Sequence, residues 1–402
     1  MRLCIALLCF FLTTAVYSQR LLKGIVLDAD KNTPVPKASV FLNNTSVGTT
    51  ANDEGRFELY IPAGKYELIV SSVGFNTGNQ SITGTDVPGY LTIKLTHKAP
   101  ELEAIVIEPY LKDGWQQWGR FFLENFIGTT AEAGNCSILN KDVIRFRHSK
   151  KDNRLTAHAS EPLLIENKAL GYRIRYQLET FRYDFQKRYV LYTGYPFFEE
   201  LKGSNRKQKA WEKKRQETYL GSLMHFMRSV YRNTIMTEGF EVRHLQKVPN
   251  VEKQRVKARY RQMFQTAQAG NTVIVSGVNQ TPDSAAYYEE ILRQPDEKDV
   301  IGREVLPGDS IAFAVDSVTA GLYFPHHLYV HYKKGTVPVE YKRLYPSGAH
   351  AMLSHIFLLD GQAVTIQANG MYYDPAEVVS SGYWGWSEKV ATMLPYDFKP
   401  KE

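Results

Sequence analysis

Residues 48–75 read GTTANDEGRFELYIPAGKYELIVSSVGF, and this stretch decides the fold of the first part of the chain. Its Asp-Glu-Gly turn is followed by Phe57, Leu59 and Ile61 at alternate positions, which places the three side chains on one face of a strand. A Pro-Ala-Gly turn then introduces a second alternating segment. Strands and turns follow one another in this way over residues 20–97, so we expect about five or six short strands packed as a small β-sandwich.

Strand and turn residues occur in a fixed order in four stretches, at residues 24–28, 34–40, 48–57 and 62–75. In this order the sequence resembles the carboxypeptidase regulatory-like domain, with glycines where that family has turns. The resemblance implies an Ig-like or prealbumin-like β-sandwich over residues 20–97, and it covers about a fifth of the chain.

Such domains are similar to the N-terminal extension of TonB-dependent outer-membrane receptors that import glycans in Bacteroidota. The segment from Leu102 to Ile107 looks like the strand that joins this extension to the receptor's plug. No plug follows, and the remaining roughly 300 residues lack the many ~10-residue alternating strands of a large barrel. The sequence therefore resembles a carboxypeptidase regulatory-like domain protein of Bacteroidota without plug or barrel, and we expect no import through a pore formed by this chain.

Residues 1–18 have the parts of a cleaved signal peptide: an early positive charge, an apolar run from Leu3 to Val16, and small residues before a cut after Ser18. The run is shorter than the about 20 apolar residues that span a membrane. Two of the three cysteines leave with the signal, and we interpret the remaining Cys136 as a small buried hydrophobe. We expect an exported protein, periplasmic or associated with the outer membrane.

Residues 110–402 predict a larger, β-rich α+β domain of unassigned function, so that the chain as a whole is mainly β with some α. An aromatic stripe after Asp113 predicts one helix that stops at Gly128, with the stripe facing the core. The stripe consists of Trp115, Trp118, Phe122 and Phe126. Extended segments dominate afterwards, and their alternation is typical of strands with one buried and one solvated face.

Two short segments, at residues 163–172 and 219–226, resemble regions that continue the regulatory domain in the same Bacteroidota proteins. The first contains Leu163 to Asn167 with Gly171, and the second contains Tyr219 to Ser222 with His225. The resemblance implies a family and no mechanism.

Two basic stretches stand out in a chain of formal net charge +7. Between Lys202 and Arg215, seven Lys or Arg residues accompany a single Glu. From Lys253 to Arg261 every second residue is basic, which would make one charged face on a strand but would spread around a helix. A solvated face is the simpler interpretation of this second stretch. The alternative is contact with an anionic surface, which for an exported protein means lipid headgroups, acidic glycans or an acidic partner and not nucleic acid.

His158 and Glu161 have the spacing of two zinc ligands in a metallocarboxypeptidase. In those peptidases, however, the regulatory domain follows the catalytic one, and the arginine of their motif is replaced here by Ser160. No convincing third ligand accompanies the pair, and a catalytic zinc needs three. His327 and His331 would share a face of a strand, with His326 on the other, but no acidic residue adjoins them. We therefore predict no catalytic residue, no metal and no cofactor.

Tyr383, Trp384 and Trp386 lie beside glycines and are the candidate binding residues, because flat aromatic rings can stack on a sugar. Core packing is the competing interpretation of these rings, and burial statistics favour it.

These observations predict an exported, non-enzymatic accessory or interaction protein of the bacterial cell envelope. Its expected partners are envelope proteins, including an outer-membrane complex, and a glycan or an anionic lipid surface. One alternative is a glycan-binding protein that uses the aromatic residues near the C-terminus. Another is a metal-dependent carboxypeptidase-like hydrolase with His158 and Glu161 as ligands.

Overall fold

The computed structural model describes residues 20–98, 109–268, 285–346 and 350–401. The expected signal peptide at residues 1–18 and the expected strand at residues 102–107 lie outside these ranges. The chain divides into two compact units, residues 1–217 with 390–402, and residues 218–389. This division differs from the expected one, because residues 110–217 belong with the N-terminal sandwich and not with the rest of the chain.

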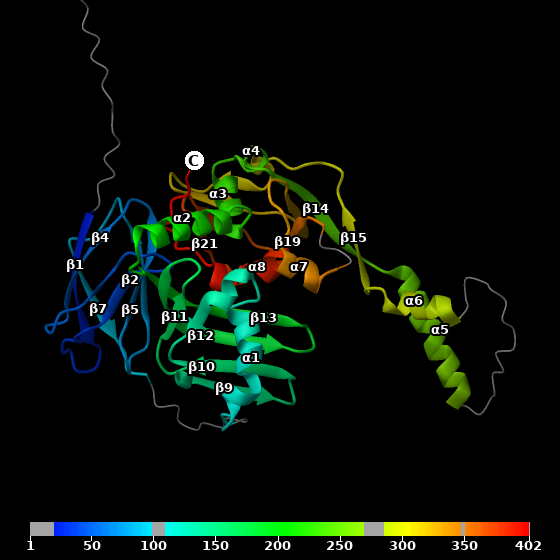
Figure 1. Cartoon of the computed structure of the whole chain (residues 1–402), viewed down its shortest axis with the longest axis horizontal. Coiled ribbons are helices and arrows are strands. Elements are labelled where there is room, and N and C mark those ends of the chain that lie inside the picture. The colour runs from blue at the N-terminus through cyan, green and yellow to red at the C-terminus, as the bar shows by residue number, and fades with distance from the viewer. Residues whose placement is uncertain (1–19, 99–108, 269–284, 347–349, 402) are drawn as a thin grey trace, which may run out of the picture. The chain divides into compact units, whose positions relative to one another are not determined.

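The first unit begins with a sandwich of two sheets, with strand orders β4-β1-β7 and β3-β2-β5-β6 (Figure 1). The strands are β1 (Arg20–Asp28), β2 (Ser39–Leu42), β3 (Gly48–Thr50), β4 (Arg56–Ile61), β5 (Lys65–Ser71), β6 (Gly78–Thr83) and β7 (Tyr90–Leu95). Phe57, Leu59 and Ile61 all point into the core, which confirms the face predicted for that strand. In β6 only Ile82 is buried, so this strand has almost no alternation that a sequence pattern could detect.

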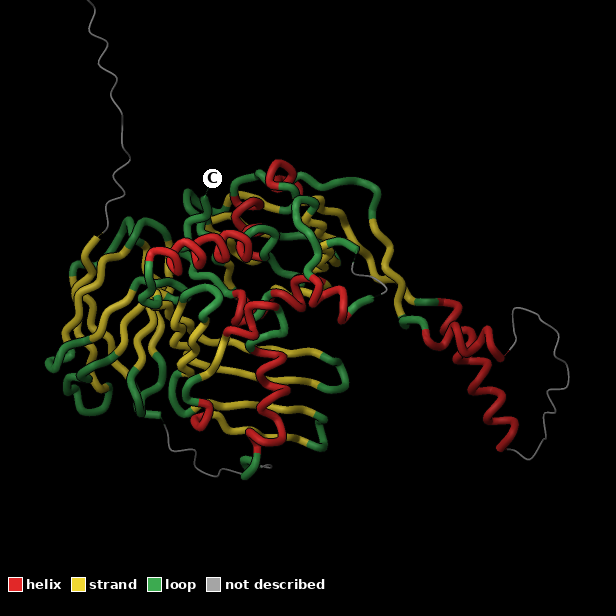
Figure 2. The backbone as a smooth tube through the Cα atoms, in the orientation of Figure 1, coloured by secondary structure: helices red, strands yellow, loops and turns green. Residues whose placement is uncertain are grey.

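A six-stranded sheet follows, in the order β8-β11-β12-β10-β9, with β13 also paired to β12. Its strands are β8 (Cys136–Ile138), β9 (Ile144–Ser149), β10 (Arg154–Ala159), β11 (Leu163–Asn167), β12 (Tyr172–Asp184) and β13 (Tyr189–Glu200). Helix α1 (Gly114–Phe126) lies across these strands (Figures 1 and 2). Phe122 and Phe126 are fully buried beneath it, and the helix ends before Gly128, whose φ is 106°. Asp113 stands at the N-cap, but its side chain makes no capping bond.

The sandwich packs against this sheet, and an isolated β-bridge between Thr45 and Phe197 joins them. Phe198 donates its backbone N–H to the carbonyl of Thr45 at 3.0 Å, and the Asn44 N–H donates to Pro196 at 2.9 Å. Phe41 and Ile69 of the sandwich share a small core with Phe197 of β13. The two parts therefore bury apolar surface against each other within one unit.

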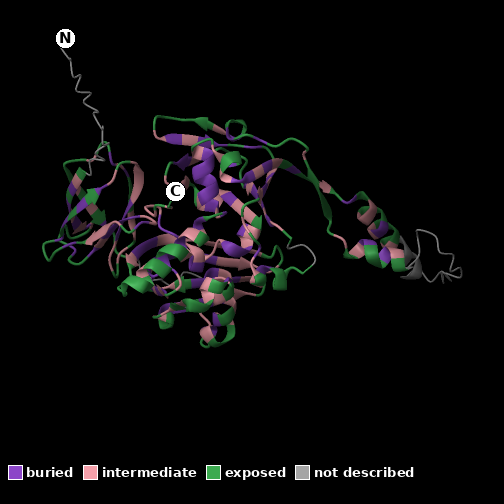
Figure 3. Cartoon of the chain, turned by 45° about the horizontal axis from the view of Figure 1, so that its top comes forward, coloured by how far each residue is buried: buried purple, intermediate pink, exposed green. Residues whose placement is uncertain are grey.

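Helix α2 (Asn205–Tyr219) leads into the second unit. There α3 (Leu223–Tyr231) has seven of its nine residues buried and is the central core helix (Figure 3). The unit also contains two sheets, in the orders β15-β14-β18-β19-β22 and β16-β17-β20-β21. The strands are β14 (Phe240–Pro249), β15 (Glu297–Ile301), β16 (Ala312–Ala314), β17 (Thr319–Leu322), β18 (His327–Tyr332), β19 (Met352–Leu358), β20 (Val364–Gln367), β21 (Tyr372–Tyr373) and β22 (Val378–Gly382).

Further helices of the second unit are α4 (Ile235–Glu238), α5 (Val251–Gln268), α6 (Ala285–Arg293), α7 (Val339–Leu344) and α8 (Tyr383–Ser387). Helices α5 and α6 lie side by side and share a small core of Val256, Tyr288 and Ile291. The basic stretch from residue 253 is therefore helical and spreads around α5, so it forms no single charged face.

The fold class is confirmed as mainly β with some α. No helix in the described ranges is long and apolar enough to cross a membrane.

Candidate functional site

His158 and Glu161, the zinc-ligand pair suggested by the sequence, are not joined by a third ligand among the described residues. His158 lies on β10 with its side chain exposed, and Glu161 follows the end of that strand and is also exposed. Neither residue belongs to the one group of three metal-ligating side chains that the described part of the chain contains. The two residues thus carry no metal geometry beyond their spacing in the sequence.

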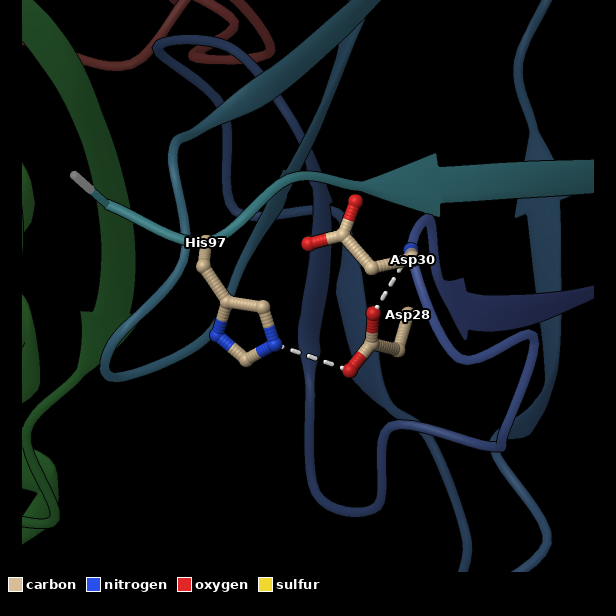
Figure 4. A group of neighbouring side chains, drawn as sticks. All are labelled: Asp28, Asp30 and His97. Carbon is tan, nitrogen blue, oxygen red and sulfur yellow. Dashed lines mark hydrogen bonds and ion pairs between the residues drawn. The ribbon is translucent and has the colours of Figure 1, made fainter.

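That one group consists of Asp28, Asp30 and His97 in the sandwich, whose ligand atoms lie within 4.8 Å of one another (Figure 4). The Asp28 carboxylate already has partners on both oxygens. Oδ1 accepts the N–H groups of Asp30 at 2.9 Å and Lys31 at 3.2 Å, and Oδ2 lies 2.9 Å from Nε2 of His97. Burial would raise the pKa of Asp28, but these three partners together lower it. The group fixes the turn after β1, and its geometry is that of a hydrogen-bonded turn.

The histidines of β18 lie where the alternation predicted. His327 and His331 share a face with Tyr329, while His326 precedes the strand with a φ of 58°. The ring of His327 packs on Phe357 at 4.8 Å, and partial burial lowers the pKa of both His327 and His331. These contacts belong to a half-buried sheet face and hold no ligand set.

Cys136 is half-buried at the start of β8. Burial raises the pKa of its thiol to about 12, so the reactive thiolate is scarce at neutral pH.

Two of the three candidate aromatic rings lie in the core. Trp384 is 2% exposed and Trp386 is 7% exposed, while Tyr383 is half-buried. The Trp384 ring contacts Phe226 at 5.2 Å, and its Nε1–H donates to the carbonyl of Gly221 at 2.8 Å. A stacking platform needs open ring faces, which these two indoles do not offer. Core packing, the competing interpretation, describes their position.

The segment at residues 163–172 builds a buried turn. The side-chain oxygen of Asn167 accepts the N–H groups of Ala169 and Leu170, and its amide donates to the carbonyl of Ala391 at 2.8 Å. Gly171 follows with a φ of 71°, and a Cβ at this position would lie 2.2 Å from the indole of Trp211.

Arg215 completes this turn from helix α2. Its Nε donates to the Leu170 carbonyl at 2.7 Å, its Nη1 donates to Glu200 at 2.6 Å, and its guanidinium stacks 3.8 Å from the ring centre of Tyr172. Arg215, the last cation of the first basic stretch, is therefore a buried structural cation. The other cations of α2 lie mainly on its exposed face.

The segment at residues 219–226 starts helix α3. Ser222 is the N-cap, and its Oγ accepts the His225 N–H at 3.1 Å. The Gly221 N–H donates to Nδ1 of His225 at 3.1 Å, and Nε2 of that ring faces Glu238 at 3.3 Å. Both segments that resemble Bacteroidota proteins are thus explained by turn and cap geometry.

A pocket of about 390 Å³ lies beside Arg215, between α2 and the C-terminal segment. Four of its charged residues form two pairs, Arg215 with Glu200 and Lys401 with Glu212 at 2.9 Å, and Lys399 also lines the pocket. Asp397 accepts hydrogen bonds from the backbone N–H and the hydroxyl of Ser46. These contacts hold the C-terminal segment against the rest of the first unit. Each of the groups that make them already has a partner in the protein, so it does not favour a ligand of one charge.

A surface at one end of the six-stranded sheet has a different character. Phe185, in the turn between β12 and β13, contacts four other rings with centroid separations of 4.8 to 5.8 Å. They are Trp118 and Phe121 of α1, His148 of β9 and Tyr183 of β12, and all five side chains are only half-buried.

Basic residues flank these rings on two neighbouring turns. The turn between β9 and β10 carries Lys150 and Lys151, and the turn between β12 and β13 carries Lys187 and Arg188. The Phe185 N–H donates to the carbonyl of Asn153 at 3.0 Å and ties the two turns together. We call these nine side chains, five aromatic and four basic, the hairpin-end surface.

Residues 22–107 match the family model of the CarboxypepD_reg-like domain. The N-terminal sandwich is a CarboxypepD_reg-like domain. The resemblance drawn from the four stretches of sequence is thereby confirmed. No protein of curated function matches the sequence.

Three solved structures are similar to parts of the chain. A DUF3823 family protein from Bacteroides ovatus shares 11% identity over 46% of this chain and 83% of its own, with a TM-score of 0.17. A protein from Bacteroides fragilis, described as putatively membrane-associated and of unknown function, shares 12% sequence identity over 86% of this chain and 92% of its own, with a TM-score of 0.16. A 9R-lipoxygenase from Cyanothece shares 11% sequence identity over 60% of this chain and 51% of its own, with a TM-score of 0.15. Scores this low carry no argument about function.

The sequence alone pointed to Trp384 and Trp386 and missed the hairpin-end surface. Trp118 was placed in a core stripe because its spacing matched that of Phe122 and Phe126. The signal that could have identified this surface is the pair of short, lysine-bearing turns outside the CarboxypepD_reg-like domain, one of which contains Phe185.

Proposed function

We propose that this chain is an exported, non-enzymatic accessory protein of the bacterial cell envelope that acts by binding other envelope components. The CarboxypepD_reg-like domain is a non-catalytic module and supports a binding role. The observation that carries the proposal is the hairpin-end surface, where half-buried aromatic rings adjoin four exposed cations whose side chains form no ion pair among the described residues. By contrast, the residues whose sequence motifs suggested a chemical role or a family resemblance lie in turns, at a helix cap or on a sheet face.

The N-terminal pattern of residues 1–18 supports export, and the periplasm or the outer membrane is the proposed location. The proposed partners are envelope proteins, including an outer-membrane complex, in contact with the surfaces of the first unit. The non-enzymatic part of the proposal is supported by His158 and Glu161, which are exposed and belong to no group of three metal-ligating side chains in the described part of the chain.

The test is photo-crosslinking in cells that express the full chain. A photoreactive amino acid replaces Gln186, which is exposed in the turn of the hairpin-end surface, and in a control chain it replaces Lys94, exposed on β7. We expect a defined crosslinked product in the envelope fraction from position 186 and a weaker one from position 94. Recovery of the chain without any crosslinked product from either position would contradict a role that depends on contact.

A further inference from the structure

The geometry points to a specific role for the hairpin-end surface: it docks the protein on the surface of an anionic phospholipid bilayer. This inference rests on the proposed function for location, since an envelope protein meets such surfaces, and it adds the chemistry of the partner. It concerns peripheral contact through side chains of the first unit.

The aromatic part of the surface suits the interfacial zone of a bilayer. Amphipathic and aromatic rings favour the headgroup region, where one part of the ring is apolar and another is hydrated. Tyr183 and His148 combine a ring with a polar atom, whereas the indole Nε1 of Trp118 is buried, so Trp118 adds apolar area together with Phe121 and Phe185. The cluster lies beside two tied turns at the end of a sheet, so several rings can approach one flat surface together.

The cationic part supplies charge complementarity. Lys150, Lys151, Lys187 and Arg188 are exposed, and within the described ranges none of the four side chains has an ion-pair partner. The two turns also carry two carboxylates. Asp184 accepts the N–H groups of Gln186 and Lys187 and lies 3.8 Å from Arg154, and Asp152 accepts the Ser149 hydroxyl at 3.3 Å. The surface therefore presents an excess of positive charge next to apolar rings, the combination that binds anionic lipid.

Arg188 offers a mild way to remove one of these charges. Its φ of 51° lies in the left-handed region, where glycine and asparagine are favoured, and Lys37 of the sandwich has a similar φ of 58°. Asparagine at position 188 therefore removes the charge and suits the backbone.

Helix α2 offers a matched comparison. Arg206, Lys207, Lys209 and Lys213 are exposed on it, but its Trp211 is buried, so this helix is basic without an adjoining exposed ring. If charge alone caused lipid binding, α2 would contribute as much as the two turns.

The experiment is co-sedimentation of the chain from residue 19 with vesicles of equimolar phosphatidylglycerol and phosphatidylcholine, and with vesicles of phosphatidylcholine alone. Each surface cation contributes about fivefold to partitioning onto anionic lipid. We expect binding to the anionic vesicles only, and an about fivefold loss for Arg188→Asn, a change that suits the backbone. The quadruple change of Lys150, Lys151 and Lys187 to Gln with Arg188→Asn should abolish binding, whereas changing the four α2 cations to Gln should retain it.

A spectroscopic readout tests the aromatic part. Anionic vesicles should shift tryptophan fluorescence of the chain to shorter wavelength, and Trp118→Phe should remove most of that shift, because the other described indoles are not part of this surface. Thermal unfolding of each variant checks that its fold is intact.

Three results would overturn the inference: no binding of the unaltered chain to anionic vesicles, equal losses for the hairpin and α2 variants, or binding to a soluble anionic polysaccharide with none to vesicles. Each of these would leave the proposed envelope role standing if the crosslinked product from position 186 is still found. Loss of that product with vesicle binding intact would instead contradict the proposed function alone.

Discussion

The indole of Trp211 occupies the space that a side chain at position 171 would need: a Cβ on Gly171 would lie 2.2 Å from Cδ2 of the ring. The Trp211 Nε1–H donates to the carbonyl of Lys168 at 2.9 Å, so the ring cannot easily move away. Glycine at this position is therefore required both by the left-handed backbone and by the packing of α2.

Gly171→Ala should destabilise the first unit by at least about 3 kcal/mol, because it combines backbone strain with a clash against a fixed ring. Gly74 is a matched control, since its φ is 85° and a Cβ there would meet nothing within 4 Å. Gly74→Ala should cost only about 1 kcal/mol. Urea unfolding of both variants measures the difference, and equal losses would show that packing at Trp211 contributes nothing.

Arg215→Ala should cost at least about 2 kcal/mol, because the buried Leu170 and Gly171 carbonyls lose a donor and Glu200 loses its partner. Arg215→Lys should recover only part of this, since one ammonium group cannot reproduce the planar fork or the stacking on Tyr172. Lys207→Ala, on the exposed face of the same helix, should change the unfolding free energy by less than about 0.5 kcal/mol. Full rescue by lysine would indicate that only the charge matters.

His225 should make the stability of the second unit fall as the pH drops below 6.5, while Glu388, whose pKa burial raises to about 7, acts in the opposite direction. Burial lowers the pKa of His225, although Glu238 opposes the shift, so the folded ring stays neutral while the unfolded one takes up a proton. The unfolded state then binds more protons, and the slope reaches up to about 1.4 kcal/mol per pH unit. His225→Gln should flatten the profile between pH 6.5 and 5, measured by urea unfolding. An unchanged slope in that variant would assign the pH dependence to other groups.

Divalent cations should leave the melting temperature of the protein unchanged, because both oxygens of Asp28 are already engaged by the turn and by His97. Asp28→Asn should lower the melting temperature in the absence of any added metal, since the pKa of Asp28 is lowered by partners that favour the ionised form. Differential scanning calorimetry with and without calcium, manganese and zinc checks both statements. A rise in melting temperature with one cation that Asp28→Asn removes would identify a metal site instead.

Much of the sandwich was predictable because its signals are local. Phe57, Leu59 and Ile61 alternate within one strand, and Gly55 supplies the turn before them with a φ of 69°. The stretch from Lys253 to Arg261 was ambiguous, because basic residues at every second position occur both on one face of a strand and around a helix. Ion pairs with acidic residues far away in the sequence can also stabilise the helical form. In the structure Lys253 and Lys257 both reach Asp296.

The candidate site was not predictable, because it depends on contacts far apart in the sequence. The burial of Trp384 is fixed by a bond to Gly221, which no local pattern around position 384 reveals. The exposure of Trp118 likewise depends on where the β9–β10 and β12–β13 turns end. Aromatic spacing identifies residues that share a face, but the tertiary fold decides whether that face meets the core or the solvent.

The most direct test of an exported envelope protein is the intact mass of the chain recovered from fractionated cells of a Bacteroidota host. We expect recovery in the periplasmic or outer-membrane fraction with a mass that corresponds to a start at Gln19. Recovery of the uncleaved chain in the cytoplasm would contradict it.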